Sequence, residues 1–233
     1  MHRGRPLPLV KIGLGVVVVL AVLLLGVGQL LLPRIAAKVV RDKLARYGQV
    51  RQVSVKAVPA LQLLWGEAGS VHATASKLTL SPNQLVSLLS EAHSIDTLSV
   101  DASTVKLHHL RFGGPATLSH ASIEKRGQSI DGKALLTSEA LAEALPAGVA
   151  VKLLSSSKGR VEVRATGSLL GFQASVDAIV EAVDGRLQLS PVGALLSGLA
   201  TLTLFEDPKL RILSVAAKPV EGAWALDLKA RLQ

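Results

Sequence analysis

The sequence predicts an α+β protein, in which an N-terminal transmembrane helix precedes a mostly antiparallel β domain with a few short helices. Three observations support this fold class. An uncharged apolar segment near the N-terminus is as long as a bilayer core is thick. After Gly48, hydrophobic residues recur at every second position, as they do in half-buried strands. A sequence motif typical of a strand that leads into a helix also occurs twice, at residues 78–89 and 187–198.

Residues 12–32 form the apolar segment. They include no charged residue, and Gln29 is their one strongly polar residue. At 1.5 Å per residue this length spans about 30 Å as a helix. The chain has no cysteine for a lipobox, and no small-x-small cleavage motif follows the segment. We therefore predict an uncleaved anchor behind a short basic tail at residues 1–11, with a cleaved signal peptide as the alternative.

The net charge of +9 comes entirely from residues 1–56, which carry ten Lys and Arg residues and one acid, Asp42. The remainder is neutral, with its basic residues scattered and not interleaved with aromatic ones, so no nucleic-acid partner is expected. Basic side chains beside a membrane segment attract anionic headgroups, by about 1 kcal/mol each. The collar predicted to do so consists of Arg34, Lys38, Arg41, Lys43 and Arg46.

The orientation of the anchor is not fixed by these charges. Three basic residues precede the segment and five follow it, which favours a cytoplasmic main domain. A very short tail before a long domain instead favours the exported arrangement. We expect a single-pass protein of the inner (plasma) membrane with its main domain on the exported, periplasmic side.

Residues 33–48 are predicted to form a basic amphipathic helix. Its apolar residues fall at helical spacing, and its basic residues take the remaining face. We expect the apolar face to pack on the domain, with contact to lipid headgroups as the alternative. The apolar residues are Ile35, Val39, Val40, Leu44 and Tyr47.

Residues 49–233 are predicted to form one domain, because no linker or low-complexity segment divides them. Turn signals at 113–115, Gly127 and 184–185, and a polar loop at 155–159, separate the strands. The expected strands are residues 53–57, 71–75, 97–100, 104–112, 116–124, 149–154, 160–166, 171–179, 186–189, 210–216 and 224–232.

The repeated motif reads Leu-x-Leu-Ser-Pro and then continues into leucines. Ser81 and Ser190 suit a helix N-cap, and Pro82 and Pro191 suit the first helical position. A looser copy at 134–145 places Thr137 at the cap. The copies are either a chance reuse of common turn residues or related units of the fold.

Catalytic and metal-binding patterns are missing from the sequence. No Gly-x-Ser-x-Gly elbow or glycine-rich phosphate loop occurs in the predicted domain. His108 and His109 are adjacent and would point to opposite faces of a strand, and no carboxylate lies at ligand spacing. We therefore predict no catalytic residue, no metal and no cofactor, and we do not expect an enzyme.

Residues 34–233 resemble the LmeA-like phospholipid-binding family of bacterial cell-envelope proteins. The likeness is a hydrophobic pattern in which a strand is followed by a Pro-containing apolar loop, a glycine and a second strand, and the segment GKALLTSEALAEALP resembles a later strand-to-helix step. Ala60 stands where the family often has Phe, and Trp65 is a nearby aromatic substitute. The matching residues are Val53, Val55, Pro59, Leu61, Leu63, Leu64, Gly66 and Val71.

This resemblance implies a tubular lipid-binding-like domain, in which a curved sheet wraps around the short helices and encloses an apolar cavity. The implied function is that of a non-catalytic phospholipid-binding or lipid-transfer accessory protein of the envelope. The apolar loop would then contact the membrane; alternatively, it is part of the ordinary hydrophobic core. A structural or interaction module without ligand is the competing hypothesis. The sequence names neither the lipid nor a protein partner. The loop residues are Leu61, Leu63, Leu64 and Trp65.

Overall fold

The computed structural model describes residues 31–57, 60–108, 114–169, 172–193 and 201–233. Within these residues the chain is mostly β-sheet with short helices, which confirms that part of the predicted fold class. Residues 31–45 are helical. The other helices are the 3-10 helix η1 (Ala60–Trp65), α2 (Pro82–Glu91) and α3 (Ser138–Ala144).

The described strands form two sheets. The larger has the order β1-β2-β3-β4-β5-β12-β11, and the smaller has the order β10-β9-β8-β7-β6. The larger sheet contains β1 (Gly48–Lys56), β2 (Ala68–Leu80), β3 (Ile95–Leu107), β4 (Ala116–Arg126), β5 (Ser129–Thr137), β11 (Leu210–Val220) and β12 (Ala223–Leu232). The smaller contains β6 (Val149–Ser157), β7 (Arg160–Leu169), β8 (Phe172–Val183), β9 (Arg186–Val192) and β10 (Leu202–Phe205).

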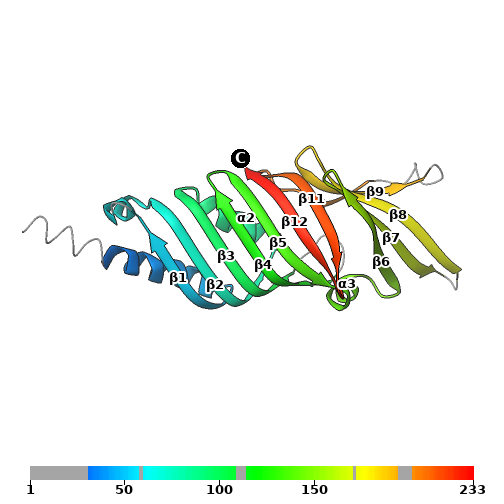
Figure 1. The fold of residues 1–233 in the computed structure, drawn as a ribbon, viewed down its shortest axis with the longest axis horizontal. Coiled ribbons are helices and arrows are strands. Elements are labelled where there is room, and N and C mark those ends of the chain that lie inside the picture. The colour runs from blue at the N-terminus through cyan, green and yellow to red at the C-terminus, as the bar shows by residue number, and fades with distance from the viewer. Residues whose placement is uncertain (1–30, 58–59, 109–113, 170–171, 194–200) are drawn as a thin grey trace, which may run out of the picture.

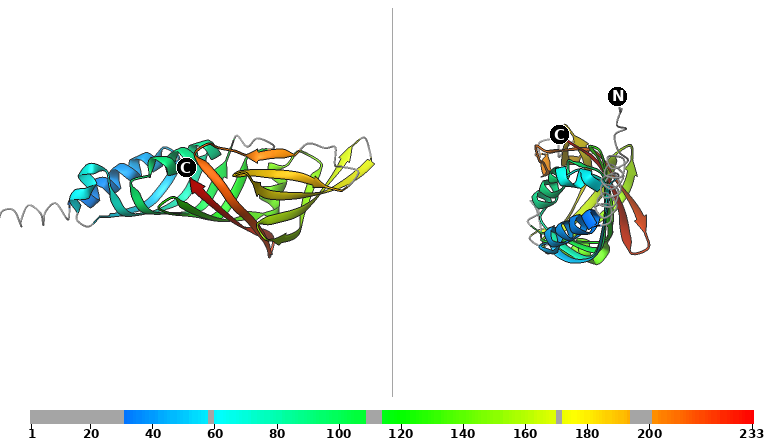
Figure 2. Two further views of the ribbon diagram at one scale, coloured as in Figure 1. Left: turned by 90° about the horizontal axis from the view of Figure 1, so that it is seen from above. Right: turned by 90° about the vertical axis from the view of Figure 1, so that its left-hand side faces the viewer.

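The molecule is elongated, with the seven-stranded sheet at one end and the five-stranded sheet at the other (Figure 1). The larger sheet curls around the helix at residues 31–45 and around α2, so these helices lie inside its concave face (Figure 2). Among the described strands, β2 and β3 pair in parallel and are joined by α2, while the other neighbouring strands pair antiparallel.

Tight turns set the hairpins of the smaller sheet. Lys158 and Gly159 both have positive φ, as do Asp184 and Gly185, which is the backbone of a two-residue turn matched to the twist of the strands. The predicted polar loop at 155–159 is therefore shorter than expected, because β6 continues through Ser157. Likewise, the strand predicted at 97–100 and the described start of the one predicted at 104–112 belong to one strand, β3, which ends at Leu107. β10 was not predicted, and β5 was anticipated only where the looser motif copy begins.

The first copy of the repeated motif has the predicted structure. β2 ends at Leu80, Ser81 caps α2 and Pro82 is its first residue. Ser81 Oγ accepts from Gln84 N at 3.3 Å, and Gln84 Oε1 accepts from Ser81 N at 2.7 Å, which together make a capping box. In the looser copy Thr137 Oγ1 accepts from Ala140 N at 3.2 Å, so Thr137 caps α3 as predicted.

The second copy of the repeated motif does not have the predicted strand-to-helix structure. Ser190 and Pro191 lie inside β9, where they are opposite Ile179 and Ala178 of β8, so the predicted N-cap and first helical residue are wrong. The pairs between β9 and β10 end at Leu189, and a strand tolerates proline where a neighbour is not paired to it. The strand alternation therefore continues through a sequence that also suits a helix start.

We expect Ser81→Ala to lower the free energy of unfolding by about 1 kcal/mol, because the Gln84 amide in the first turn loses its side-chain acceptor. Chemical denaturation followed by circular dichroism measures this change. Ser87→Ala is the matched control on α2, since the Ser87 hydroxyl lies within the helix and donates to the Glu91 carboxylate at 3.2 Å. Equal losses from both variants would contradict the capping role.

Several sequence predictions fall outside the described residues. These are the basic tail at 1–11, residues 12–30 of the predicted anchor, Pro59, residues 109–112 of one predicted strand, Gly113, residue 171 of another predicted strand and residues 194–198 of the second motif. Within the residues that the structure describes, no helix is both long and apolar enough to cross a bilayer.

Candidate functional site

A large apolar cluster fills the space between the concave sheet and the helices. Its partly buried neighbours include Ala36, Ala37 and Val40 of the first helix and Leu63 of η1. Small alanines let that helix approach the sheet closely. We call this the helix-covered cluster; its buried members are Val55, Ala68, Val71, Val86, Leu89, Ala92, Leu98, Ile130, Leu210, Ala230 and Leu232.

A second apolar cluster lies where the five-stranded sheet packs over the far end of the larger sheet. Its buried members are Val161, Val163, Ala178 and Ala217, and Trp224 and Leu226 of β12 pack against them. The contact also ties the two sheets by a hydrogen bond, since Ala217 N donates to Ser156 Oγ at 3.0 Å. We call this the sheet-covered cluster.

Strand β12 carries both clusters on one face. Trp224 and Leu226 belong to the sheet-covered cluster, while Ala230 and Leu232 belong to the helix-covered cluster. All four occupy even positions, and β12 pairs with β5 without a register shift, so their side chains point to the same side. The inner face of the larger sheet is therefore apolar from one cluster to the other.

A half-buried apolar stretch joins the clusters, and we call it the inner strip; Ile123 at one end packs against the helix-covered cluster and Leu226 at the other against the sheet-covered cluster. Leu228 stands opposite Gly132, which in turn stands opposite Ile123 of β4, and Leu226 stands opposite Ala134. All five residues are half-buried. A Cβ built on Gly132 would lie 3.8 Å from Leu228 Cβ, an ordinary contact, so the glycine lowers the surface of the strip here. The inner strip thus consists of Ile123, Gly132, Ala134, Leu226 and Leu228.

Lys125 is a charged residue buried on the same face. It lies two residues after Ile123, is 1% exposed, and its Nζ donates to the Ile95 carbonyl oxygen at 2.7 Å. Burial lowers the pKa of Lys125, and the nearby Asp96 carboxylate opposes that shift. The sequence analysis missed this residue. The signal was present, because the alternation that buries Ile123 also turns Lys125 inward.

The predicted membrane-contact loop forms η1, which contains Leu61, Leu63, Leu64 and Trp65. Leu63 packs against the helix-covered cluster, whereas Trp65 is 74% exposed. The segment therefore divides its apolar residues between the core and the surface. It lies at the end of the molecule where the helix at residues 31–45 begins (Figures 1 and 2).

The basic helix also has two different apolar sides. Val40 packs on the helix-covered cluster and Tyr47, just after the helix, on a neighbouring cluster, as expected. Ile35 and Val39 do not share that face, because Ile35 is 60% and Val39 63% exposed. The prediction of a single packed face was wrong, since Ala36 and Ala37 make the contact instead.

The predicted collar residues Arg34, Lys38, Arg41, Lys43 and Arg46 are all exposed. Lys43 forms an ion pair with Glu91 of α2, which lowers the pKa of that carboxyl. This pair links the first helix to α2 at the surface.

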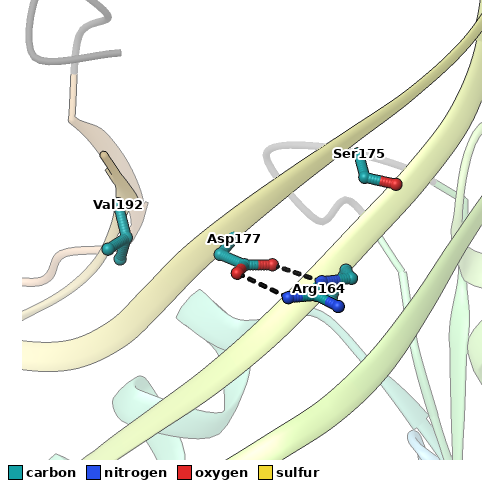
Figure 3. Close-up of a pocket in the computed structure, with 4 residues that line it drawn as sticks. All are labelled: Arg164, Ser175, Asp177 and Val192. Carbon is teal, nitrogen blue, oxygen red and sulfur yellow. Dashed lines mark hydrogen bonds and ion pairs between the residues drawn. The ribbon is translucent and has the colours of Figure 1, made fainter. Parts of the chain in front are cut away.

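A pocket of about 260 Å³ lies on the five-stranded sheet, lined by Arg164, Ser175, Asp177 and Val192 (Figure 3). Arg164 donates two hydrogen bonds to the Asp177 carboxylate, at 2.6 and 2.8 Å. The guanidinium is thereby neutralised, which leaves the pocket little attraction for an anion. Among the described residues no group of His, Cys, Asp or Glu could hold a metal ion.

A curled sheet with an apolar inner face, covered by short helices, defines a mostly β protein with an extended apolar interior. A family model described as LmeA-like phospholipid-binding matches residues 23–217. The match covers most of the sequence, so this chain belongs to the LmeA-like phospholipid-binding family, as its resemblance implied. No curated protein and no solved structure matches the chain significantly.

Proposed function

We propose that this chain is a membrane-anchored phospholipid-binding or lipid-transfer accessory protein of the bacterial cell envelope that acts without catalysis. The observation that carries the proposal is the inner strip, an apolar and half-buried surface that joins two apolar clusters along one sheet face. Membership of a phospholipid-binding family supports it.

In this proposal the acyl chains lie along the inner strip. Each buried methylene contributes about 0.8 kcal/mol, so a lipid chain is held mainly by apolar area and needs few polar contacts. Gly132 and Ala134 keep the strip low, and Leu226, Leu228 and Ile123 supply aliphatic surface. The headgroup remains at the surface, where exposed basic side chains attract an anionic lipid.

The apolar segment at 12–32 serves as the anchor, and the main domain lies on the exported side of the inner membrane. Two features support this arrangement: the length of the apolar segment, and the exposure of all five collar residues just after it. Such a protein would hold its lipid site next to the bilayer from which the lipid comes.

Native mass spectrometry of the full-length chain, released from a mild detergent and followed by organic extraction, tests the proposal. We expect a discrete added mass that extracts as phospholipid. A clean apo mass, with no uptake from vesicles containing phosphatidylglycerol, would instead support a structural module of the envelope without ligand.

A further inference from the structure

Three large apolar side chains form an exposed line along the helix at residues 31–45. Leu31 is 49%, Ile35 60% and Val39 63% exposed. They are spaced four residues apart, so they lie on one side of the helix and extend over about 12 Å. Single exposed hydrophobic residues are normal on a protein surface, but a continuous line of three is not.

Positive charge borders this line. Positions 34, 38 and 41 are rotated to one side of Leu31 and Ile35, at about 100° per residue. Lys43 is not counted in this border, because it pairs with Glu91 of α2. Asp42, the one acidic residue at positions 31–45, is exposed and lies on the same side as the line, between the directions of Leu31 and Ile35, so the cations outnumber the acid there but do not exclude it. The side of the helix opposite the core therefore combines exposed aliphatic side chains with a cationic border.

An exposed indole lies at the same end of the molecule. η1, which ends at Trp65, is beside the start of the basic helix in both views of that end (Figures 1 and 2). Trp65 is 74% exposed, the highest value among the large hydrophobic residues described. Tryptophan is enriched where a protein meets the interface of a bilayer, because its ring is apolar and its N–H polar.

We propose that Leu31, Ile35, Val39 and Trp65 form a docking face that inserts into the headgroup layer of an anionic bilayer. Exposed aliphatic residues bordered by cations match a surface with negative headgroups above acyl chains, which is the composition of interfacial helices. A protein partner fits less well, since protein interface cores are depleted of charge and Lys is under-represented there. This inference rests on the membrane location proposed above but not on a bound lipid.

The docking face fixes how the molecule meets the membrane. The face lies on the outer side of a helix whose other side packs, through Ala36, Ala37 and Val40, on the helix-covered cluster. A bilayer that receives the face is therefore one helix diameter away from the apolar interior. The end with η1 then lies at the membrane, and the five-stranded sheet is at the other end of the molecule.

The absence of cysteine from the sequence allows a direct test with single labels. Full-length Ile35→Cys and Val39→Cys are labelled with a polarity-sensitive fluorophore and reconstituted in vesicles of phosphatidylcholine and phosphatidylglycerol. Val192→Cys is the control, because Val192 is 45% exposed on β9 of the five-stranded sheet, at the other end of the molecule.

We expect the labels at 35 and 39 to shift to the blue and to be quenched by nitroxide-bearing lipids, with the label at 192 unchanged. Reversing Lys38 and Arg41 to Glu should raise the fraction of phosphatidylglycerol needed for half-maximal quenching. Labels at 35 and 39 that remain as open to aqueous quencher as the label at 192 would overturn the docking face. So would protection seen in native membranes but not in these vesicles, because it indicates a protein partner.

These experiments test the proposed lipid cargo and the proposed docking face independently. A chain that yields no phospholipid on extraction, yet is quenched at 35 and 39, retains the docking face and refutes the proposed cargo. A chain that carries phospholipid but shows no quenching at 35 and 39 supports the proposed cargo and refutes the docking face.

Discussion

Ala134→Trp is expected to remove most of the phospholipid that the protein retains. Ala134 lies on the inner strip opposite Leu226, and an indole there occupies space that the proposal gives to an acyl chain. Excluding about two methylenes at about 0.8 kcal/mol each weakens binding by about tenfold. The measurement is the amount of phospholipid extracted per mole of full-length protein.

Lys133→Trp is the matched control, since Lys133 is the neighbouring residue of β5 and is exposed on the other face. It should leave lipid content unchanged. If the strip is instead filled by protein, Ala134→Trp overpacks the core and lowers stability by about 1–3 kcal/mol without affecting any lipid. That result would favour the structural module over the lipid carrier.

Lys125→Met is expected to stabilise the fold, by roughly 1–4 kcal/mol, because it removes a buried ammonium from the inner face while keeping a similar volume. Loss of the hydrogen bond from Lys125 to the Ile95 carbonyl offsets part of this gain. Equilibrium denaturation of both proteins gives the difference. A marked loss of stability in the variant would mean that the buried ammonium is needed to satisfy the carbonyl groups after α2.

The same residue predicts a pH dependence. Since burial lowers the pKa of Lys125, the unfolded chain binds more protons than the folded one between the folded pKa and the ordinary value of about 10.4. Stability contributed by this residue therefore rises with pH through that window, and the rise should vanish in Lys125→Met. Lys229→Met, which alters an exposed lysine of β12, should retain it.

The local structure was predictable where one physical requirement decided it. Ser81 and Pro82 begin α2 as their residue types suggest, but Ser190 and Pro191 repeat those types inside a strand. The difference is tertiary, because β8 offers a partner along β9 as far as Val192, and pairing outweighs capping. A motif that satisfies both structures cannot reveal which neighbour it will find.

The candidate site was predictable only in outline. Helical spacing correctly predicted an amphipathic helix with basic residues, but it did not predict which apolar residues face the core. Ala36 and Ala37 pack inward. Ile35 and Val39 are exposed instead. The inner strip arises from pairing between β5 and β12, which are about ninety residues apart in sequence. Alternation within either strand predicts a buried face but not what lies across it.

The pairing of β5 with β12 constrains the order in which the domain can fold. The five-stranded sheet is inserted in the sequence between β5 and β11, and the helix-covered cluster includes Leu210, Ala230 and Leu232 from the last strands. While the domain folds, β5 therefore has one unpaired edge beside an incomplete core until β12 pairs with it. Unpaired strand edges are sites where incompletely folded chains aggregate. By pairing with β5, β12 therefore protects the domain from such association.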